Sequence, residues 1–298
     1  MYRLHGRVAL LLLLAATVAC SSRASDAGAP GPVDDYGAPV PRGTHTAPAR
    51  IVSLNPTTTQ ILFAIGAGDR VVGRTSWDLW PDAARRVPDL GPGLRPNVEA
   101  VLARHPDLVL LYASNDNRAA ASQLRAAHVP VLALKVDRIE EFRRAALLVG
   151  RATGDSARAA TVVDTVMRTL DRVRAATAHL PHPTVFWHVW DAPIITIGRG
   201  SYLTQLLEIA GGTNVYGDLP QSSPQVSLED IIRRDPDYVL AGAEGAARVR
   251  ASAEWRAVGA VKAGRVLVVD TTLIGMPSVR LGEAAVSLAR LLHPGALP

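Results

Sequence analysis

The chain is poor in cysteine, lysine and aromatic residues, and each shortage excludes a class of structure or partner. Among its 298 residues there is one cysteine, which excludes an internal disulfide framework and a metal site built from several cysteines. Lys135 and Lys262 are the only lysines, so nearly all of the 32 basic residues are arginines. These arginines are scattered and the formal net charge is only +5, so no basic block of the kind that binds nucleic acid is present.

No apolar run is long enough to cross a membrane. Val8–Ala19 is an unbroken stretch of apolar and small residues, shorter than the roughly 20 residues that a membrane span needs. It follows Arg3 and Arg7, as the core of a secretory signal peptide does. Cys20 comes directly after it and looks like the lipidated cysteine of a bacterial lipoprotein signal. We therefore expect residues 1–20 to export the chain and Cys20 to anchor it; the alternative is a plain signal peptide with an incidental cysteine.

Residues 21–49 are rich in Ala, Gly, Pro and Ser. Such a composition buries little apolar surface, so we expect a flexible linker there. About 250 residues then remain for a folded body, and this length favours two domains over one. The overall content of 48% apolar and 20% charged residues is typical of a globular protein.

From residue 50 onward, short β-branched runs alternate with amphipathic stretches. The pattern predicts strands at Ile51–Leu54, Val109–Leu111 and Val131–Leu134, and helices at Thr59–Ile65 and Ala119–His128. Strands that alternate with helices favour parallel α/β sheets.

An internal repeat indicates that the folded body consists of two related halves. Residues 99–110 and 229–240 are identical at six of twelve positions without a gap, at an offset of 130 residues. Two copies are too few for a solenoid, so the repeat predicts two similar lobes.

A single long helix is expected between the two halves. Val163, Val166 and Leu170 recur at a spacing of three or four residues, and a helix over 155–180 would measure roughly 37 Å. The simpler interpretation is a long surface helix without a special role. We favour a rigid strut that joins the lobes. The predicted fold is α/β: two Rossmann-like lobes with parallel sheets, joined by one long backbone helix. Its predicted parts are an N-terminal lobe at 50–154, the helix at 155–180 and a C-terminal lobe at 181–298.

The order and spacing of these features resemble the periplasmic substrate-binding proteins of ABC importers for iron-siderophores, haem and vitamin B12, in particular the vitamin B12-binding type. The resembling stretches include residues 50–56, 97–110, 206–212, 224–240 and 278–290. The resemblance implies an extracytoplasmic monomer that holds cobalamin or a related metal chelate between its lobes and passes it to permease and ATPase subunits. The implied cargo is a cobalt or iron chelate, with no resident cofactor, no nucleic acid and no membrane contact beyond the lipid anchor.

Two glutamates occupy matching places in the repeat. Glu99 and Glu229 each lie two residues after a candidate helix cap, at Asn97 and Ser227. A carboxylate in a first helical turn complements the helix dipole by about 0.3–1 kcal/mol, so either glutamate alone is explained by capping. As a pair they resemble the family's docking glutamates, and the resemblance implies that they position the protein on the permease.

Four aromatic residues fall in expected loops or at strand ends, where a ligand is reached more easily than the core. They are Trp77, Trp80, Tyr112 and Trp190, and their flat rings would stack on a large conjugated ligand. Trp187 directly follows Phe186 in the opening segment of the second lobe and is expected in the core. Aromatic residues of the B12-binding pattern are missing at 91–94, Val189 and Ser223, so a siderophore or haem remains an alternative ligand.

Polar candidates for the cleft lie in the C-terminal half. They are Arg199, Tyr202, Met276, Ser278 and Arg280. Arg280 has the guanidinium geometry to pair with ligand carboxylates, or with a carboxylate of its own lobe. The stretch Gly198–Ser201 has backbone amides that would suit an anion, although a simple turn is the more ordinary interpretation.

No catalytic constellation is recognisable, and His188 is the only candidate for an axial metal ligand. No nucleophile elbow, phosphate-binding loop or His-Glu-x-x-His motif is present. A lone histidine beside Trp187 is more often structural than metal-binding. The prediction is therefore a binding protein and not an enzyme. Two rivals stay open: a chelatase-like enzyme on a similar scaffold, and a surface-anchored sensor without a transporter.

Overall fold

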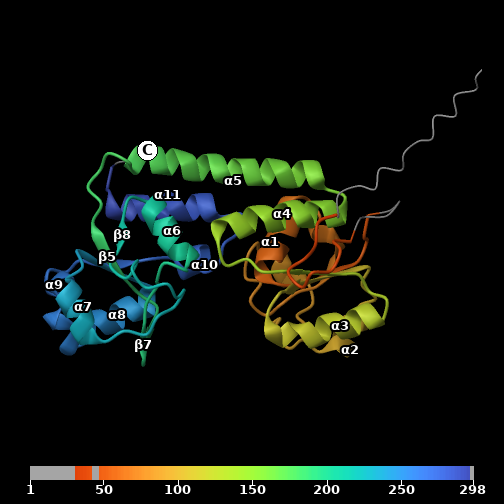
Figure 1. Cartoon of the computed structure of the whole chain (residues 1–298), viewed down its shortest axis with the longest axis horizontal. Helices are drawn as coiled ribbons and strands as arrows, with labels where there is room; N and C mark the ends of the chain where they lie inside the picture. Colours follow the sequence, from red (N-terminus) through yellow and green to blue (C-terminus); the bar gives the residue numbers. More distant parts are fainter. Residues whose placement is uncertain (1–30, 42–46, 296–298) are drawn as a thin grey trace, which may run out of the picture. The chain divides into compact units, whose positions relative to one another are not determined.

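The computed structural model describes residues 31–41 and 47–295. The predicted signal peptide, Cys20 and most of the predicted linker lie outside these residues. The described residues from Pro32 onward belong to one compact unit (Figure 1). Within this part of the chain, no helix is both long enough and apolar enough to cross a bilayer.

Four parallel strands form the sheet of the N-terminal lobe, in the order β2-β1-β3-β4. They are β1 (Ile51–Leu54), β2 (Val71–Gly73), β3 (Leu108–Tyr112) and β4 (Val131–Leu134). The helices of this lobe are α1 (Pro56–Ala64), α2 (Val98–Leu102), α3 (Arg118–Ala126) and α4 (Ile139–Thr153), with short 3-10 helices η1 (Gly68–Arg70), η2 (Ala84–Arg86) and η3 (Asn115–Asn117). Every residue of β1 and β4 is buried, as expected for a parallel sheet covered on both faces.

The sheet of the C-terminal lobe has the same topology, in the order β8-β5-β9-β10. Its strands are β5 (Thr184–His188), β8 (Thr213–Asn214), β9 (Tyr238–Ala241) and β10 (Val266–Val268), and a separate antiparallel hairpin pairs β6 (Trp190–Asp191) with β7 (Ile194–Ile195). The helices are α6 (Tyr202–Ile209), α7 (Leu228–Arg234), α8 (Ala243–Ala251), η4 (Glu254–Ala257), α9 (Gly259–Lys262), α10 (Thr271–Ile274) and α11 (Leu281–Leu292). The predicted α/β class with two related lobes and parallel sheets is thus confirmed.

One aspartate of the sequence repeat makes the same contact in both lobes. Asp107 and Asp237 each stand just before the strand that pairs with the first strand of their sheet. The Asp107 carboxylate accepts the backbone N–H of Arg50 at 2.9 Å, and the Asp237 carboxylate accepts the backbone N–H of Thr184 at 2.8 Å. These bonds tie the starts of β1 and β3, and of β5 and β9, together at the same register.

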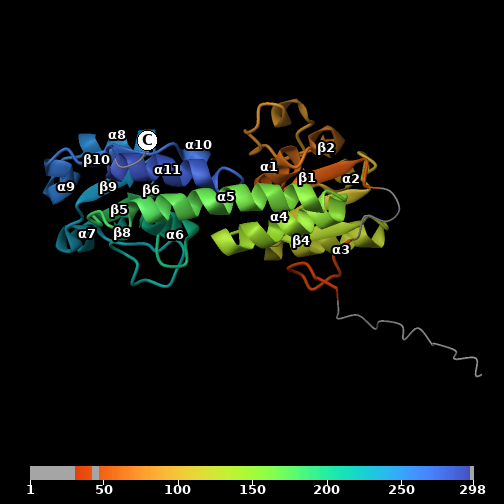
Figure 2. The same cartoon turned by 90° about the horizontal axis from the view of Figure 1, so that it is seen from above.

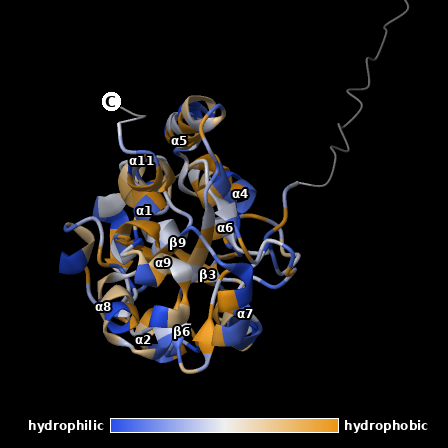
Figure 3. Cartoon of the chain, turned by 90° about the vertical axis from the view of Figure 1, so that its left-hand side faces the viewer, coloured by the Kyte–Doolittle hydropathy of each residue, from blue (hydrophilic) through white to orange (hydrophobic). Residues whose placement is uncertain are grey.

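The two lobes are joined by the 22-residue helix α5 (Ser156–Thr177), which measures about 33 Å. Its residues Val163, Val166, Leu170 and Val173 are buried and belong to an apolar core that includes residues of both lobes. The helix packs against α4 at the N-terminal lobe and against α6 and α11 at the C-terminal lobe (Figures 1 and 2). Seen end-on, α5 lies above α11 and α6 and carries both hydrophilic and hydrophobic residues (Figure 3). It is the predicted backbone helix.

The prediction of a flexible linker over 21–49 is wrong for the part that the structure describes there. Residues 32–40, which we call the N-terminal clasp, form a tight turn on the edge strand β4. The backbone N–H of Asp35 donates to the carbonyl of Ala133 at 2.9 Å, and Val40 is buried in the core of the lobe. The clasp therefore covers a strand edge that would otherwise expose its hydrogen-bonding groups.

Asp34 holds the clasp in place. Its side chain is 0% exposed and forms an ion pair with Arg125 at 2.6 Å. Its two oxygens also accept the backbone N–H groups of Tyr36 and Ala38, both at 2.9 Å, and of Ala133 at 3.1 Å. A buried carboxylate with this many donors is satisfied, and removing it leaves several of them without a partner.

We expect the substitution Asp34→Ala to lower the free energy of unfolding by about 2–3 kcal/mol, because it strands the Arg125 guanidinium and the buried Ala133 amide. Urea unfolding followed by circular dichroism measures the change. Asp164→Ala on the exposed face of α5 is the matched control and should stay within about 0.5 kcal/mol of the wild type. Equal midpoints for the two variants would show that the clasp adds no stability.

Candidate ligand-binding site

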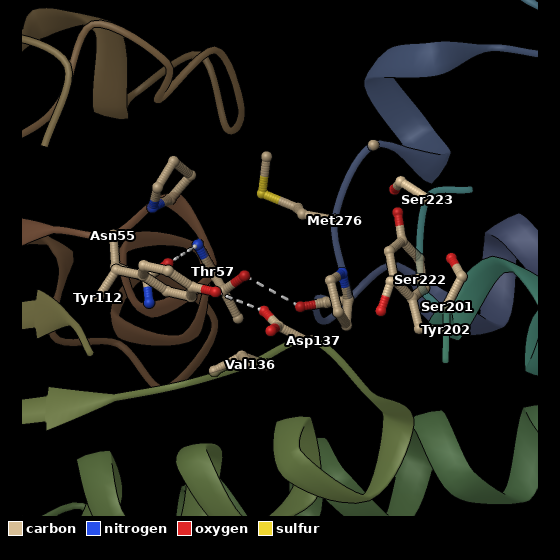
Figure 4. Close-up of a pocket in the computed structure, with 13 residues that line it drawn as sticks. Asn55, Thr57, Tyr112, Val136, Asp137, Ser201, Tyr202, Ser222, Ser223 and Met276 are labelled. Atoms are coloured by element: carbon tan, nitrogen blue, oxygen red, sulfur yellow. Dashed lines mark hydrogen bonds between the residues drawn. The ribbon is translucent and has the colours of Figure 1, made fainter. Parts of the chain in front are cut away.

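Three pockets meet around the segment 271–277 of the C-terminal lobe. The cleft pocket, of about 340 Å³, lies between the lobes, with Asn55, Tyr112 and Asp137 on one side and Tyr202 on the other (Figure 4). The aromatic pocket, of about 350 Å³, is also built from both lobes, and the C-lobe pocket, of about 520 Å³, belongs to the C-terminal lobe. Met276 lines the first two pockets, so a single bulky ligand can occupy adjoining compartments.

The N-terminal side of the cleft pocket is polar and sits at the carboxyl end of β3. The Tyr112 hydroxyl donates to the Asp137 carboxylate at 2.7 Å, and Lys135 pairs with the same carboxylate at 3.2 Å. Burial, together with this hydrogen bond, raises the pKa of Tyr112 above its ordinary value. The phenol therefore stays protonated at physiological pH. This is the crevice in which open α/β sheets bind ligands.

The aromatic pocket brings together four of the predicted ligand residues. Trp77, Trp80 and Arg280 line it together with Met276. The Arg280 guanidinium carbon lies 5.2 Å from the centroid of the Trp80 ring, a cation-π contact, and its Nε donates to Glu283 at 2.9 Å. Trp77 is 63% exposed, which is unusual for so large an apolar side chain beside a pocket. A flat ligand that covered the indole would remove this surface from water.

Asp78 positions the loop that carries the two tryptophans. It is 1% exposed, and one carboxylate oxygen accepts both the backbone N–H of Thr75 at 2.6 Å and the Thr75 hydroxyl at 2.8 Å. The same hydroxyl accepts the backbone N–H of Trp77 at 3.2 Å. Burial raises the pKa of Asp78, while the hydrogen bonds from Thr75 act in the opposite direction. The conformation of the loop therefore depends on a carboxyl group whose ionisation is opposed by burial.

The two lobes touch on either side of the cleft pocket. The Thr57 hydroxyl on α1 donates to the carbonyl of Pro277 at 3.0 Å (Figure 4). At the start of α4, the backbone N–H of Ile139 donates to Gln205 of α6 at 3.2 Å, and Gln205 donates to Glu140 at 2.9 Å. These contacts hold the lobes at a defined separation.

Two further candidates also border this region. Tyr202 lines both the cleft pocket and the C-lobe pocket, and its hydroxyl donates to the carbonyl of Ile274. Ser278 is buried and its hydroxyl oxygen accepts the backbone N–H of Arg280 at 3.2 Å, so it supports Arg280 from within the lobe. Trp187 is 3% exposed in the apolar core, which confirms the expectation for that residue.

His188 lies in a side-chain network at the wall of the C-lobe pocket. Its side chain is buried, its Nε2 is hydrogen-bonded to Asp191 at 2.7 Å, and its ring contacts Trp255 edge-to-face at 5.6 Å between centroids. Asp191 also pairs with Arg248 at 2.5 Å, so the imidazole is held within a side-chain network. Within residues 31–41 and 47–295, no group of three His, Cys, Asp or Glu side chains is arranged to hold a metal ion.

Trp190 and Arg199 do not line the three pockets, although residues close to them in the chain do, Val189 in the C-lobe pocket and Ser201 in the cleft pocket. Trp190 is on the β6–β7 hairpin, is 57% exposed, and donates its indole N–H to Ala192 at 3.3 Å. Arg199 is exposed, and its backbone N–H donates to Leu219 at 2.8 Å. The neighbouring amides of Gly198 and Gly200 donate to backbone carbonyls as well, so this turn has no free amides for an anion.

The sequence reasoning missed the polar residues that the N-terminal lobe contributes. Asn55, Thr57 and Asp137 line the cleft pocket, and Gln60 lines the aromatic pocket. A signal was available, because each follows the carboxyl end of a predicted strand or lies in the next helix. Asn55 lies within the stretch 50–56 that carries the family resemblance.

Glu99 and Glu229 occupy equivalent positions on α2 and α7. Each is exposed and is the second helical residue after a side-chain cap, which is Asn97 in one lobe and Ser227 in the other. Hydrogen bonds from its own backbone N–H and from the Ser227 hydroxyl lower the pKa of Glu229. Both α2 and α7 lie on the side of the molecule opposite α5 (Figures 1 and 3).

The fold and the cleft define a class, the two-lobed binding protein whose lobes are joined by one long helix. Residues 51–273 match the model of the periplasmic binding protein family, and the chain belongs to this family. This membership, together with the inter-lobe cleft, makes the molecule a binding protein of extracytoplasmic type.

Individual relatives support the same class. The chain is 33% identical over 264 residues to a cobalamin-binding protein of Halobacterium salinarum. The aligned residues cover 83% of this chain and 70% of that protein. It is 30% identical to an ABC transporter substrate-binding lipoprotein, YvrC, of Bacillus subtilis, over 83% of this chain and 81% of that protein. The solved structure of a periplasmic heme-binding protein, RhuT, of Roseiflexus sp. shares the fold, with a TM-score of 0.75 and 24% identity over 83% of this chain and 98% of that one.

We expect Asp78→Asn to gain stability relative to the wild type as the pH rises from 4 to 7. A raised pKa in the folded state means that the wild-type carboxyl stabilises the fold while it is protonated, and that this contribution is lost as the pH rises through the folded pKa. The amide has no such loss and keeps an oxygen for Thr75. Urea midpoints of both proteins at pH 4, 5, 6 and 7 measure the difference, and parallel pH profiles would contradict it.

Proposed function

We propose that this protein is the substrate-binding component of an ABC importer and that it holds cobalamin between its two lobes. The observation that carries the proposal is the inter-lobe cleft in which the polar wall at Tyr112 and the exposed indole of Trp77 meet at Met276. A large, flat, amide-rich macrocycle suits such a cleft, because it offers faces for stacking and a polar rim for hydrogen bonds. The 33% identical cobalamin-binding relative supports this choice of ligand.

The structure also supports a binding mode with little motion. α5 buries apolar residues against both lobes, and the bonds of Thr57 and Gln205 already link the lobes beside the cleft. A cleft that is largely formed before the ligand arrives loses little conformational freedom on binding. Affinity then depends on the lining side chains and not on a large closure.

The proposal also covers export, anchoring and partners. Residues 1–20 export the chain, Cys20 carries the lipid anchor, and the folded body faces the permease from outside the cytoplasm. The lipoprotein relative of Bacillus subtilis supports the anchor. The protein acts as a monomer with permease and ATPase partners. It catalyses no reaction and has no resident cofactor, so any cobalt or iron arrives as part of the cargo.

Haem or a ferric siderophore is the second candidate ligand, because the aromatic pocket also contains cations. Arg85 and Arg280 both line it, and arginine recognises the carboxylates that haem carries. Both guanidinium groups have protein partners, however: Arg85 donates to the carbonyl of Leu79 at 2.8 Å, and Arg280 donates to Glu283 at 2.9 Å. We therefore favour cobalamin.

Isothermal titration of the purified mature protein should show tighter binding of cyanocobalamin than of haem or a ferric siderophore. Trp80→Ala should weaken cyanocobalamin binding about tenfold to a hundredfold, because it removes a stacking ring and the partner of Arg280. Trp190→Ala is the matched control, since Trp190 lines none of the three pockets. The affinity of this variant for cyanocobalamin should stay within about threefold of the wild type.

Tight binding of haem with no binding of cyanocobalamin would replace the ligand but keep the class. A larger loss in Trp190→Ala than in Trp80→Ala would move the ligand site from the aromatic pocket to the β6–β7 hairpin.

We also propose that Glu99 and Glu229 dock the protein on the permease. Both are exposed, and neither forms an ion pair among the residues that the structure describes. Their helices lie on the same side of the two lobes, away from α5, so both can meet one partner surface at once (Figure 1). Exposed charges at two separated points orient an encounter more than they add affinity.

The double charge reversal Glu99→Arg/Glu229→Arg should leave cyanocobalamin affinity unchanged and abolish uptake. Affinity is measured on the purified protein, and uptake in cells that depend on this importer. Asp164→Arg/Glu208→Arg changes the net charge equally on α5 and α6 and should leave uptake intact. Normal uptake in the Glu99/Glu229 variant would remove the docking role, and lost binding in the purified variant would assign the glutamates to the fold or the ligand.

A further inference from the structure

Two amide side chains at the cleft are buried and each has one polar atom without a hydrogen-bond partner. They are Asn55, which lines the cleft pocket, and Gln60, which lines the aromatic pocket. Both residues are 4% exposed, and the unpartnered atoms are Asn55 Nδ2 and Gln60 Oε1. Buried polar atoms are nearly always paired in folded proteins, so two such atoms at one ligand cleft call for a physical explanation.

The orientation of each amide follows from its other hydrogen bond. Asn55 caps α1, and its Oδ1 accepts the backbone N–H of Thr57 at 3.1 Å, so the unpaired atom is the nitrogen donor. Gln60 faces the sulfur of Met276 at 3.7 Å, and a thioether only accepts hydrogen bonds. The nitrogen of Gln60 must therefore point at the sulfur, which leaves its oxygen as an unpaired acceptor.

Met276 is the movable element between these groups and the ligand. It lines both the cleft pocket and the aromatic pocket, and its sulfur accepts a hydrogen bond from Gln60 at 3.7 Å. Methionine is unbranched and changes rotamer easily. A ligand that displaces this side chain gains access to the Gln60 amide at little cost to the protein.

We propose that Gln60, assisted by Asn55, recognises primary amide groups on the rim of the ligand and discriminates against carboxylates at the same place. This inference rests on the proposed function, and it names the chemical feature of a corrin that the cleft reads. A primary amide supplies an N–H donor for Gln60 Oε1 and a carbonyl acceptor for Asn55 Nδ2. A carboxylate supplies acceptors only, and its charge would face the lone pairs of the Gln60 oxygen in a poorly solvated site.

The rim chemistry of the candidate ligands makes this distinction decisive. The corrin ring of cobalamin carries acetamide and propionamide groups, whereas haem carries propionates. The Gln60 oxygen is therefore a specificity determinant that favours the corrin over the porphyrin through its rim groups.

The test compares cyanocobalamin with its three monocarboxylic acids, in each of which one propionamide is hydrolysed. By titration calorimetry, the wild-type protein should bind cyanocobalamin about tenfold more tightly than at least one of these acids. Gln60→Met has a side chain of similar length without the acceptor oxygen, and its preference at that position should fall to within about twofold. Gln60→Glu keeps the acceptor oxygens, so its preference for the amide should be at least as large as in the wild type.

Gln123→Met, on the exposed face of α3, is the matched control and should bind all four ligands as the wild type does. The melting temperature of ligand-free Gln60→Met should not fall, because the substitution removes an unpaired buried oxygen. A large fall would assign Gln60 a structural role and overturn the proposal.

The two levels of the proposal fail differently. A wild-type protein that binds cyanocobalamin and its acids equally, or a Gln60→Met variant that keeps the wild-type preference, overturns the role of Gln60 alone. A wild-type protein that binds no cyanocobalamin overturns the proposed function, and the inference with it.

Discussion

The burial of one apolar face of α5 against both lobes is the constraint on which the rest of the structure depends. Val163 and Val166, and Leu170 and Val173 about one turn further on, belong to a core that includes residues of both lobes. A hinge within this helix would expose that core to water, so large opening motions are opposed by the hydrophobic effect. The separation of the lobes at the cleft is therefore set by packing that lies away from the ligand. The side chains that line the cleft do not have to hold the lobes together and can serve recognition.

Because the two lobes share one topology, functional side chains occupy equivalent positions in both. Each lobe arranges its four parallel strands in the same order, and Asp107 and Asp237 bridge the starts of the corresponding strand pairs. The carboxyl ends of β3 and β9 consequently lie at corresponding crevices, and α2 and α7 carry Glu99 and Glu229 at the same helical position. One duplicated unit thus accounts for both a two-sided cleft and a pair of exposed charges on one side of the molecule.

The elements that depend on periodicity and repetition could be predicted from the sequence. The segments whose conformation depends on partners far away in the chain could not. The strands at Ile51–Leu54 and Val131–Leu134 and the helix α5 follow from local patterns. The N-terminal clasp was missed because its composition resembles that of a linker, and only the distant partners of Asp34 order it. Trp190 is on a short hairpin that was not predicted from the sequence, and its ring is 57% exposed there.

Asp34 and Gln60 show how differently the same lobe treats buried polar groups. Where the clasp has a purely structural task, both carboxylate oxygens of Asp34 are satisfied by protein donors. At the cleft, the amides of Asn55 and Gln60 are each left one bond short. Local rules of polar satisfaction are broken most often at functional sites, where a ligand supplies what the fold withholds. We assign the two amides to recognition because both line inter-lobe pockets, whereas the other partnerless buried atoms of this lobe, such as Ser114 Oγ and Arg151 Nε, belong to residues that line none of the three.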